Sequence, residues 1–170
     1  MIELLAPLKA LFEWVNTFES SIALRESQYV WALITTAHVL FMGLFAGLIT
    51  MMDLRLLGIG NMTTPFSQLQ RRLFPWQMLG MAGSSVTGLV LVYSDPMRFY
   101  VSIFFWVKMA TMAIAGINAM AFHAISYERV VEWDTAPAPP FGARLAGGLG
   151  LLLWANVIVN GRLIPYNWFL

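Results

Sequence analysis

Four apolar stretches separated by short polar segments set the pattern of this chain. They cover about residues 28–52, 76–93, 100–127 and 144–160. A helix needs roughly 20 residues to cross the hydrocarbon core of a bilayer, and each stretch approaches or exceeds that length. We therefore expect an all-α fold in which residues 1–170 form a single membrane domain. The expected architecture is a four-helix bundle that crosses the membrane four times, with both termini on one side.

Charged and turn-forming residues mark the ends of these stretches. Asp53 and Arg55 close the first stretch, and we interpret them as a structural ion pair. Pro75 opens the second stretch at a first-turn position, which proline tolerates. The proline-rich segment 135–140 is expected to be an extended linker before the last stretch.

The N-terminal segment follows a different pattern. In residues 3–20, leucines, valine and phenylalanines recur at helical spacing, and charged or polar residues occupy the opposite stripe. This pattern predicts an amphipathic helix that lies in the membrane interface rather than across it. Residues 64–74 predict a second short interfacial helix. The start of the chain lacks the basic region and cleavage site of a removable signal peptide.

Composition supports a membrane protein and narrows its chemistry. Hydrophobic residues make up 59% of the 170 residues and charged residues 11%, whereas about a quarter of an ordinary soluble domain is charged. The net charge of +1 gives no reason to expect a nucleic-acid partner. The chain has no cysteine, so disulfides, thiolate metal sites, iron–sulfur clusters and covalently attached haem are excluded.

Small residues repeat every four positions along three of the stretches. Such stripes let helix backbones approach closely in lipid, so we expect them at helix contacts. The stripes are Gly80, Ser84 and Gly88; Thr111, Ala115 and Ala119; and Ala146 and Gly150. Asn156 and Asn160 are one turn apart, and we expect them to form hydrogen bonds between helices or to line a site.

Both histidines, His38 and His123, lie within apolar stretches. Ionisable residues at membrane depth are costly and indicate function. Imidazole is the usual axial ligand of haem, so haem b is the expected cofactor, with a metal ion held by His and Met as the alternative. We prefer His38 and His123 as the pair of iron ligands. The depths of the two histidines in the membrane differ by about 15 Å at 1.5 Å per residue. The depth of Lys108 is closer to that of His38. Lys108 is expected either to take part in the cofactor site or to extend its side chain to the membrane interface.

Several segments resemble an uncharacterised family of small bacterial four-helix membrane proteins. The similarity is carried by His38-Val-Leu-Phe-Met-Gly43, Asp53-Leu-Arg55, Trp106-Val-Lys108, Asn118 to His123 and Gly161-Arg162. More distantly, the chain is similar to HemJ-type and CopD-type membrane proteins. The HemJ resemblance implies a haem site that involves His38 and Lys108. The family resemblance also implies the bacterial inner membrane as the location.

These observations favour a b-type cytochrome-like membrane protein. Such a protein transfers electrons to or from a quinone or a partner subunit, alone or in a homo-oligomer or larger complex. Two other hypotheses stay open: a cofactor-free accessory subunit of a membrane complex, and a protein that handles copper or a small solute. No recognisable enzyme motif decides whether the chain is an enzyme.

Overall fold

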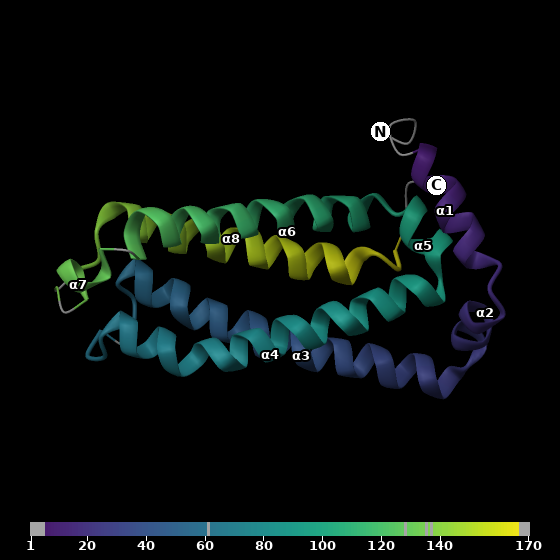
Figure 1. Cartoon of the computed structure of the whole chain (residues 1–170), viewed down its shortest axis with the longest axis horizontal. Coiled ribbons are helices and arrows are strands. Elements are labelled where there is room, and N and C mark those ends of the chain that lie inside the picture. The colour runs from purple at the N-terminus through teal and green to yellow at the C-terminus, as the bar shows by residue number, and fades with distance from the viewer. Residues whose placement is uncertain (1–5, 61, 128, 135, 137, 167–170) are drawn as a thin grey trace.

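Four long helices run side by side along the long axis of the molecule (Figure 1). They are α3 (Gln28–Leu57), α4 (Phe66–Ser94), α6 (Ile103–Phe122) and α8 (Phe141–Leu163). The structure is a computed structural model that describes residues 6–60, 62–127, 129–134, 136 and 138–166. No strand occurs among these residues, so the predicted all-α class is confirmed.

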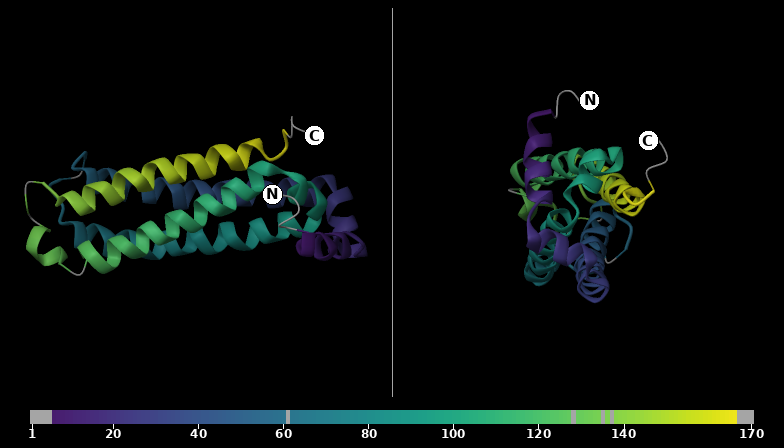
Figure 2. Two further views of the ribbon diagram at one scale, coloured as in Figure 1. Left: turned by 90° about the horizontal axis from the view of Figure 1, so that it is seen from above. Right: turned by 90° about the vertical axis from the view of Figure 1, so that its right-hand side faces the viewer.

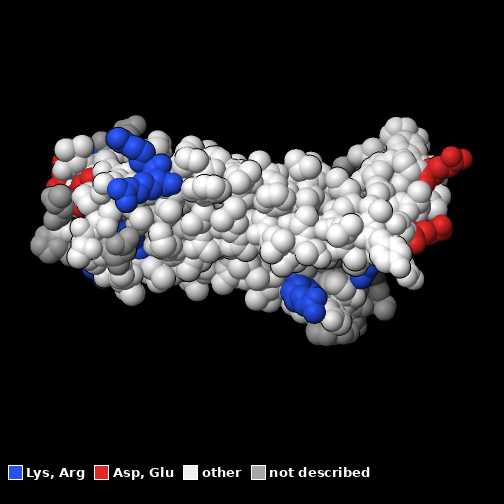
Figure 3. Space-filling view, turned by 90° about the horizontal axis from the view of Figure 1, so that it is seen from below, with Lys and Arg blue, Asp and Glu red and all other residues white. Residues whose placement is uncertain are grey.

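Three described helices are long and apolar enough to cross a membrane: α3, the segment Ile103–Tyr127 that contains α6, and α8. Helix α4, which contains the predicted stretch 76–93, has 29 residues. Its polar and small residues, Gln77 and Ser84 among them, make it less apolar than the other three. On the face shown in Figure 3, charged side chains gather toward the two ends and leave a white stretch between them.

Glycines bring α3 and α4 into close contact. A Cβ atom added at Gly80 would lie 2.8 Å from the backbone nitrogen of Phe45, and one at Gly88 would lie 3.1 Å from Cε1 of His38. Two of the three members of the predicted stripe, Gly80 and Gly88, therefore face α3, as expected. Gly83, which the four-residue stripe does not include, also faces α3, where it packs against the ring of Phe41.

Polar side chains join α6 to α8. Thr111 Oγ1 lies 3.1 Å from Asn156 Oδ1, and Asn118 Nδ2 donates to the carbonyl of Ala146 at 2.9 Å. Asn160 Nδ2 donates to the same Asn156 oxygen at 2.7 Å, within α8. Helix α8 also packs against α3, so the long helices touch in the order α4, α3, α8, α6.

The N-terminal segment forms two helices rather than the single helix predicted over residues 3–20. They are α1 (Ala6–Asn16) and α2 (Glu19–Glu26), and residues 3–5 lie outside the described part of the chain. Both cross one end of the long helices (Figure 2). The ring of Phe12 packs 5.5 Å from that of Tyr100, and buried Ser21 donates to the carbonyl of Tyr93 at 2.8 Å. These contacts fix α1 and α2 to the bundle end.

The predicted short helix over 64–74 is not separate, because α4 continues through Pro75. Two contacts fix the start of α4 at Phe66. Phe66 is buried against Trp133, with ring centroids 5.5 Å apart, and the Asp134 carboxylate accepts from the backbone N–H of Ser67 at 2.9 Å. The carboxylate acts as a helix cap supplied by a distant segment.

The third stretch is also divided differently from the prediction over 100–127. A short helix, α5 (Pro96–Val101), ends at buried Ser102, and α6 begins at Ile103. After α6 the chain forms a π-helical turn, η2 (His123–Tyr127), and then the short α7 (Val130–Trp133). In the predicted linker 135–140, residues 136 and 138–140 are not helical, as expected, and Thr135 and Pro137 lie outside the described residues.

Asp53 and Arg55 do not form the ion pair that we expected. The guanidinium of Arg55 donates from Nε and Nη2 to the carbonyl of Thr64, each at 3.3 Å. Residues two apart on a helix point to different faces, which explains why the two side chains do not meet.

Candidate functional site

A cavity of about 400 Å³ lies at the end of the bundle that carries α5. It is formed by the start of α3, the end of α4, α5, the start of α6 and the end of α8. Its volume falls within the roughly 300–1,000 Å³ of typical ligand pockets. His38 and Lys108, two of the three predicted site residues, both line it. Most of the wall is apolar, from residues that include Trp31, Val39, Met42, Leu91, Phe99 and Ile158. We call it the His38 cavity.

His38 is held by α4. Its Nδ1 lies 3.0 Å from Oγ1 of Thr87, and the Thr87 hydroxyl donates to the carbonyl of Gly83 at 2.6 Å. Because the hydroxyl proton is directed to that carbonyl, Thr87 accepts the N–H of His38 Nδ1. This assignment leaves Nε2 of His38 with its lone pair. An imidazole oriented in this way by its other nitrogen is typical of a metal-bound histidine.

The His38 cavity carries an excess of positive charge. Lys108 lies along α8, where a Cβ atom added at Gly161 would be 3.4 Å from Nζ. Arg98 and Arg162 also line the cavity. Among the described lining residues the one carboxylate is that of Asp95, which lies 3.9 Å from the guanidinium of Arg25. The cavity therefore favours a ligand that combines apolar surface with negative charge.

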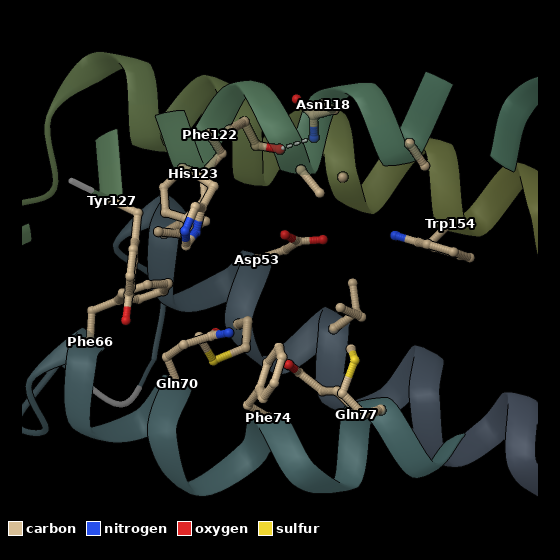
Figure 4. A pocket seen from close by; sticks show the side chains of 18 residues that line it. Asp53, Phe66, Gln70, Phe74, Gln77, Asn118, Phe122, His123, Tyr127 and Trp154 are labelled. Carbon is tan, nitrogen blue, oxygen red and sulfur yellow. Dashed lines mark hydrogen bonds between the residues drawn. The ribbon is translucent and has the colours of Figure 1, made fainter. Parts of the chain in front are cut away.

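The third predicted site residue, His123, lies elsewhere. It lines a second cavity, of about 230 Å³ (Figure 4). This cavity lies toward the end of the bundle that carries α7 (Figure 1). The imidazole of His123 stacks on the ring of Tyr127, with centroids 4.7 Å apart and an angle of 18° between the planes. The preferred pairing of His38 and His123 on one iron is not the arrangement of this structure. Helices α3 and α6 run in the same direction (Figure 1), so the depth difference expected from the sequence persists.

The second cavity also contains a residue that sequence reasoning interpreted only as structural. Asp53 is 9% exposed, and its Oδ2 is buried without a hydrogen-bond partner. We call this space the Asp53 cavity. The signal in the sequence was the Asp-x-Arg spacing, which prevents the pair from meeting on one helix face.

No three His, Asp or Glu side chains of the described chain cluster as ligands for a bare metal ion. That observation does not bear on haem, whose iron needs only axial ligands from the protein.

Comparison with protein-family models, with curated proteins and with solved structures finds no match to this chain. The resemblance to HemJ-type and CopD-type proteins therefore stays a prediction. The chemistry of the two cavities therefore indicates what this chain can bind.

Proposed function

We propose that this chain is a b-type cytochrome-like protein of the bacterial inner membrane, which holds haem b in the His38 cavity. In this proposal α3, α4, α6 and α8 all span the bilayer. Three of them are apolar enough to do so alone. Helix α4 is supported by its close packing on α3, which directs its small residues toward protein rather than lipid.

The observation that carries the proposal is the orientation of His38. Its Nδ1–H is bonded to Thr87, and the remaining nitrogen, Nε2, has the lone pair that an axial ligand needs. In an apolar span an unpartnered imidazole nitrogen has no water to satisfy it. Iron coordination satisfies it and gives the histidine a function. Bound haem supplies one-electron chemistry, with a quinone or a partner subunit as the proposed electron donor or acceptor.

The charges around His38 also fit haem b. Haem b has a large apolar macrocycle and two carboxylates on one edge. In this proposal the apolar wall of the His38 cavity contacts the macrocycle, and the cationic side chains that line it, Lys108, Arg98 and Arg162, pair with the carboxylates. The HemJ resemblance implies His38 and Lys108 as haem-site residues, and both line this cavity. Two roles for Lys108 follow: its ammonium pairs with a haem carboxylate, or its neutral amine binds the iron.

The test is the reduced-minus-oxidised absorption spectrum of the purified full-length protein, made with ample haem supply. We expect haem bands in the wild type and their loss in His38→Ala. His123→Ala is the matched control, because it removes the other histidine from the other cavity. It should keep the bands.

Lys108→Ala and Lys108→Gln separate the two lysine roles. If the amine binds iron, both variants shift the band positions. If the ammonium pairs with a carboxylate of the haem, both keep the band positions and only weaken retention. Absence of bands from the wild type contradicts the proposal and favours the accessory-subunit hypothesis. Loss of bands in His123→Ala with retention in His38→Ala contradicts the assignment to the His38 cavity.

A further inference from the structure

The Asp53 cavity lies at the opposite end from the proposed haem site. Its lining comes from the second half of α3, the first half of α4, the end of α6 with η2, and the first half of α8. The carboxylate of Asp53 points into this space, between His123 and Trp154 (Figure 4). Asp53 is only 9% exposed, and its Oδ2 has no hydrogen-bond partner.

A buried carboxylate without a partner is costly, so the structure needs a reason to keep it. Arg55 does not serve as its direct partner, because its guanidinium is bonded to the carbonyl of Thr64 and to Sδ of Met62. None of the described residues that line the Asp53 cavity is Lys or Arg. The described lining of the cavity therefore offers a carboxyl group with no Lys or Arg beside it.

Helix α8 is built to leave room for this carboxylate. A Cβ atom added at Gly150 would overlap the Asp53 carboxylate, and one at Gly147 would lie 2.7 Å from the Asp53 carbonyl oxygen. Without side chains at these two positions, α8 approaches the α3 backbone and Asp53 keeps its orientation. Any larger residue at position 150 would displace the carboxylate.

Aromatic rings surround the remaining space. Five aromatic side chains contribute to the lining: Phe66, Phe74, Phe122, Tyr127 and Trp154. The π-helical turn η2 carries Tyr127, and such turns are frequent at functional sites. The faces of aromatic rings attract cations, and aromatic cages recognise organic ammonium groups.

Neutral polar groups complete the lining. Gln77, only 3% exposed, and Asn118 both line the cavity. Asn118 donates its amide N–H to the carbonyl of Ala146 at 2.9 Å, which holds its side chain against α8. The side-chain carbonyl oxygen of a neutral amide such as Gln77 accepts hydrogen bonds from an ammonium group and adds no charge of its own.

We propose that the Asp53 cavity binds a small organic ammonium cation. The Asp53 carboxylate supplies the counter-charge, and the aromatic rings contact the alkyl groups. The cavity volume of about 230 Å³ suits a cation of a few carbon atoms, since a water molecule occupies roughly 30 Å³ in the liquid. The ligand is opposite in charge to the one proposed for the His38 cavity.

The test uses the full-length protein in detergent, titrated with tetramethylammonium and methylammonium chloride by calorimetry at constant ionic strength. tert-Butanol, which is similar in shape and uncharged, is the ligand control. We expect wild type to bind at least one ammonium ion, and to bind it more tightly than tert-butanol. Asp53→Asn should weaken ammonium binding at least tenfold. Asp95→Asn, the same change in the His38 cavity, should leave the affinity within twofold.

Circular dichroism and size-exclusion profiles show whether each variant keeps its fold, and Trp154→Leu gives a second probe that keeps the carboxylate. It should weaken ammonium binding several-fold. Failure of wild type to bind either cation, or equal binding by wild type and Asp53→Asn, overturns the proposal. Infrared spectroscopy gives a third outcome that overturns the proposal: a protonated-carboxyl band that disappears in Asp53→Asn but does not change when ammonium is added to wild type. That band would show that Asp53 binds only a proton. The haem spectrum of Asp53→Asn should be unchanged, which keeps this test separate from the proposed function.

Discussion

The two cavities use one helical scaffold for opposite charges. The His38 cavity lies at the α5 end and collects Lys108, Arg98 and Arg162, whereas the Asp53 cavity lies at the α7 end and has no Lys or Arg among its described lining residues. Each key side chain faces a glycine on a neighbouring helix, His38 at Gly88 and Asp53 at Gly150. The shared backbone design makes room for the polar group, and the side chains at each end decide which ligand charge fits.

The two polar groups also differ in how completely they are satisfied. His38 has a hydrogen-bond partner that orients it, Thr87. Asp53 has a buried oxygen with no partner. A satisfied group is preorganised to present its free atom, whereas an unsatisfied one gains most when a ligand arrives. This contrast predicts that loss of the Thr87 hydroxyl leaves His38 able to bind its ligand with reduced affinity, whereas loss of the Asp53 carboxylate removes the charge on which ammonium binding depends.

The largest expected effect concerns membrane topology, which decides whether the two cavities lie near opposite faces of the membrane. If all four long helices cross, reporters fused after Met62 and after Ala138 lie in one compartment and a reporter after Asp95 lies in the other. The measurement is a pair of compartment-specific reporters, such as alkaline phosphatase and a fluorescent protein, at each position. If α4 does not cross, Met62 and Asp95 share a compartment and Ala138 reports the opposite one. That result would remove the four-span proposal.

The next effect tests the glycine behind Asp53. Gly150→Ala places a methyl group where the carboxylate lies, so we expect ammonium binding to fall at least tenfold. Gly116→Ala is the matched control, because a Cβ atom at position 116 meets nothing within 4 Å. Calorimetric titration of both variants measures the affinity, and the haem spectrum should be unchanged in both. Equal ammonium affinity in the two variants would separate Asp53 from the binding site.

Much of the helical framework follows from the sequence. Apolar runs and small-residue stripes depend on local spacing, and the contacts of Gly80, Gly88 and Thr111 agree with them. The continuity of α4 through Pro75 could not be predicted in this way. The start of α4 at Phe66 also depends on a distant residue, Asp134, which accepts from the backbone N–H of Ser67 in the first turn. Local spacing does not contain that contact.

The two sites also differ in how far the sequence predicts them. The placement of His38 and Lys108 in one cavity follows from their similar depth in helices that run in the same direction. The importance of Asp53 could not be predicted, because it depends on what the side chain lacks: an ion pair with Arg55 and a partner for Oδ2. Gly150 was correctly expected at a helix contact, but its effect on the Asp53 carboxylate requires the packed α3 and α8.

The smallest expected effect concerns the hydrogen bond that orients His38. Thr87→Val keeps the side-chain shape and removes the hydroxyl that accepts the N–H of His38 Nδ1. Loss of such an outer partner typically lowers metal affinity about 10–100-fold. Because the proposed haem site in the His38 cavity also has apolar walls and cations, we expect a loss of haem affinity near the lower limit, measured by transfer of haem to an excess of apomyoglobin.

Two control variants isolate the hydroxyl. Thr87→Ser keeps the acceptor and should retain haem as wild type does. Thr36→Val makes the same change on α3, where the Thr36 hydroxyl donates only to the carbonyl of Ala32 within its own helix at 2.8 Å, and it should also retain haem. If Thr87→Val and Thr36→Val release haem at the same rate, the bond between His38 and Thr87 does not prepare an iron ligand. It then serves only to join α3 and α4, and the contrast between a preorganised histidine and an unsatisfied carboxylate no longer describes the two ends of the molecule.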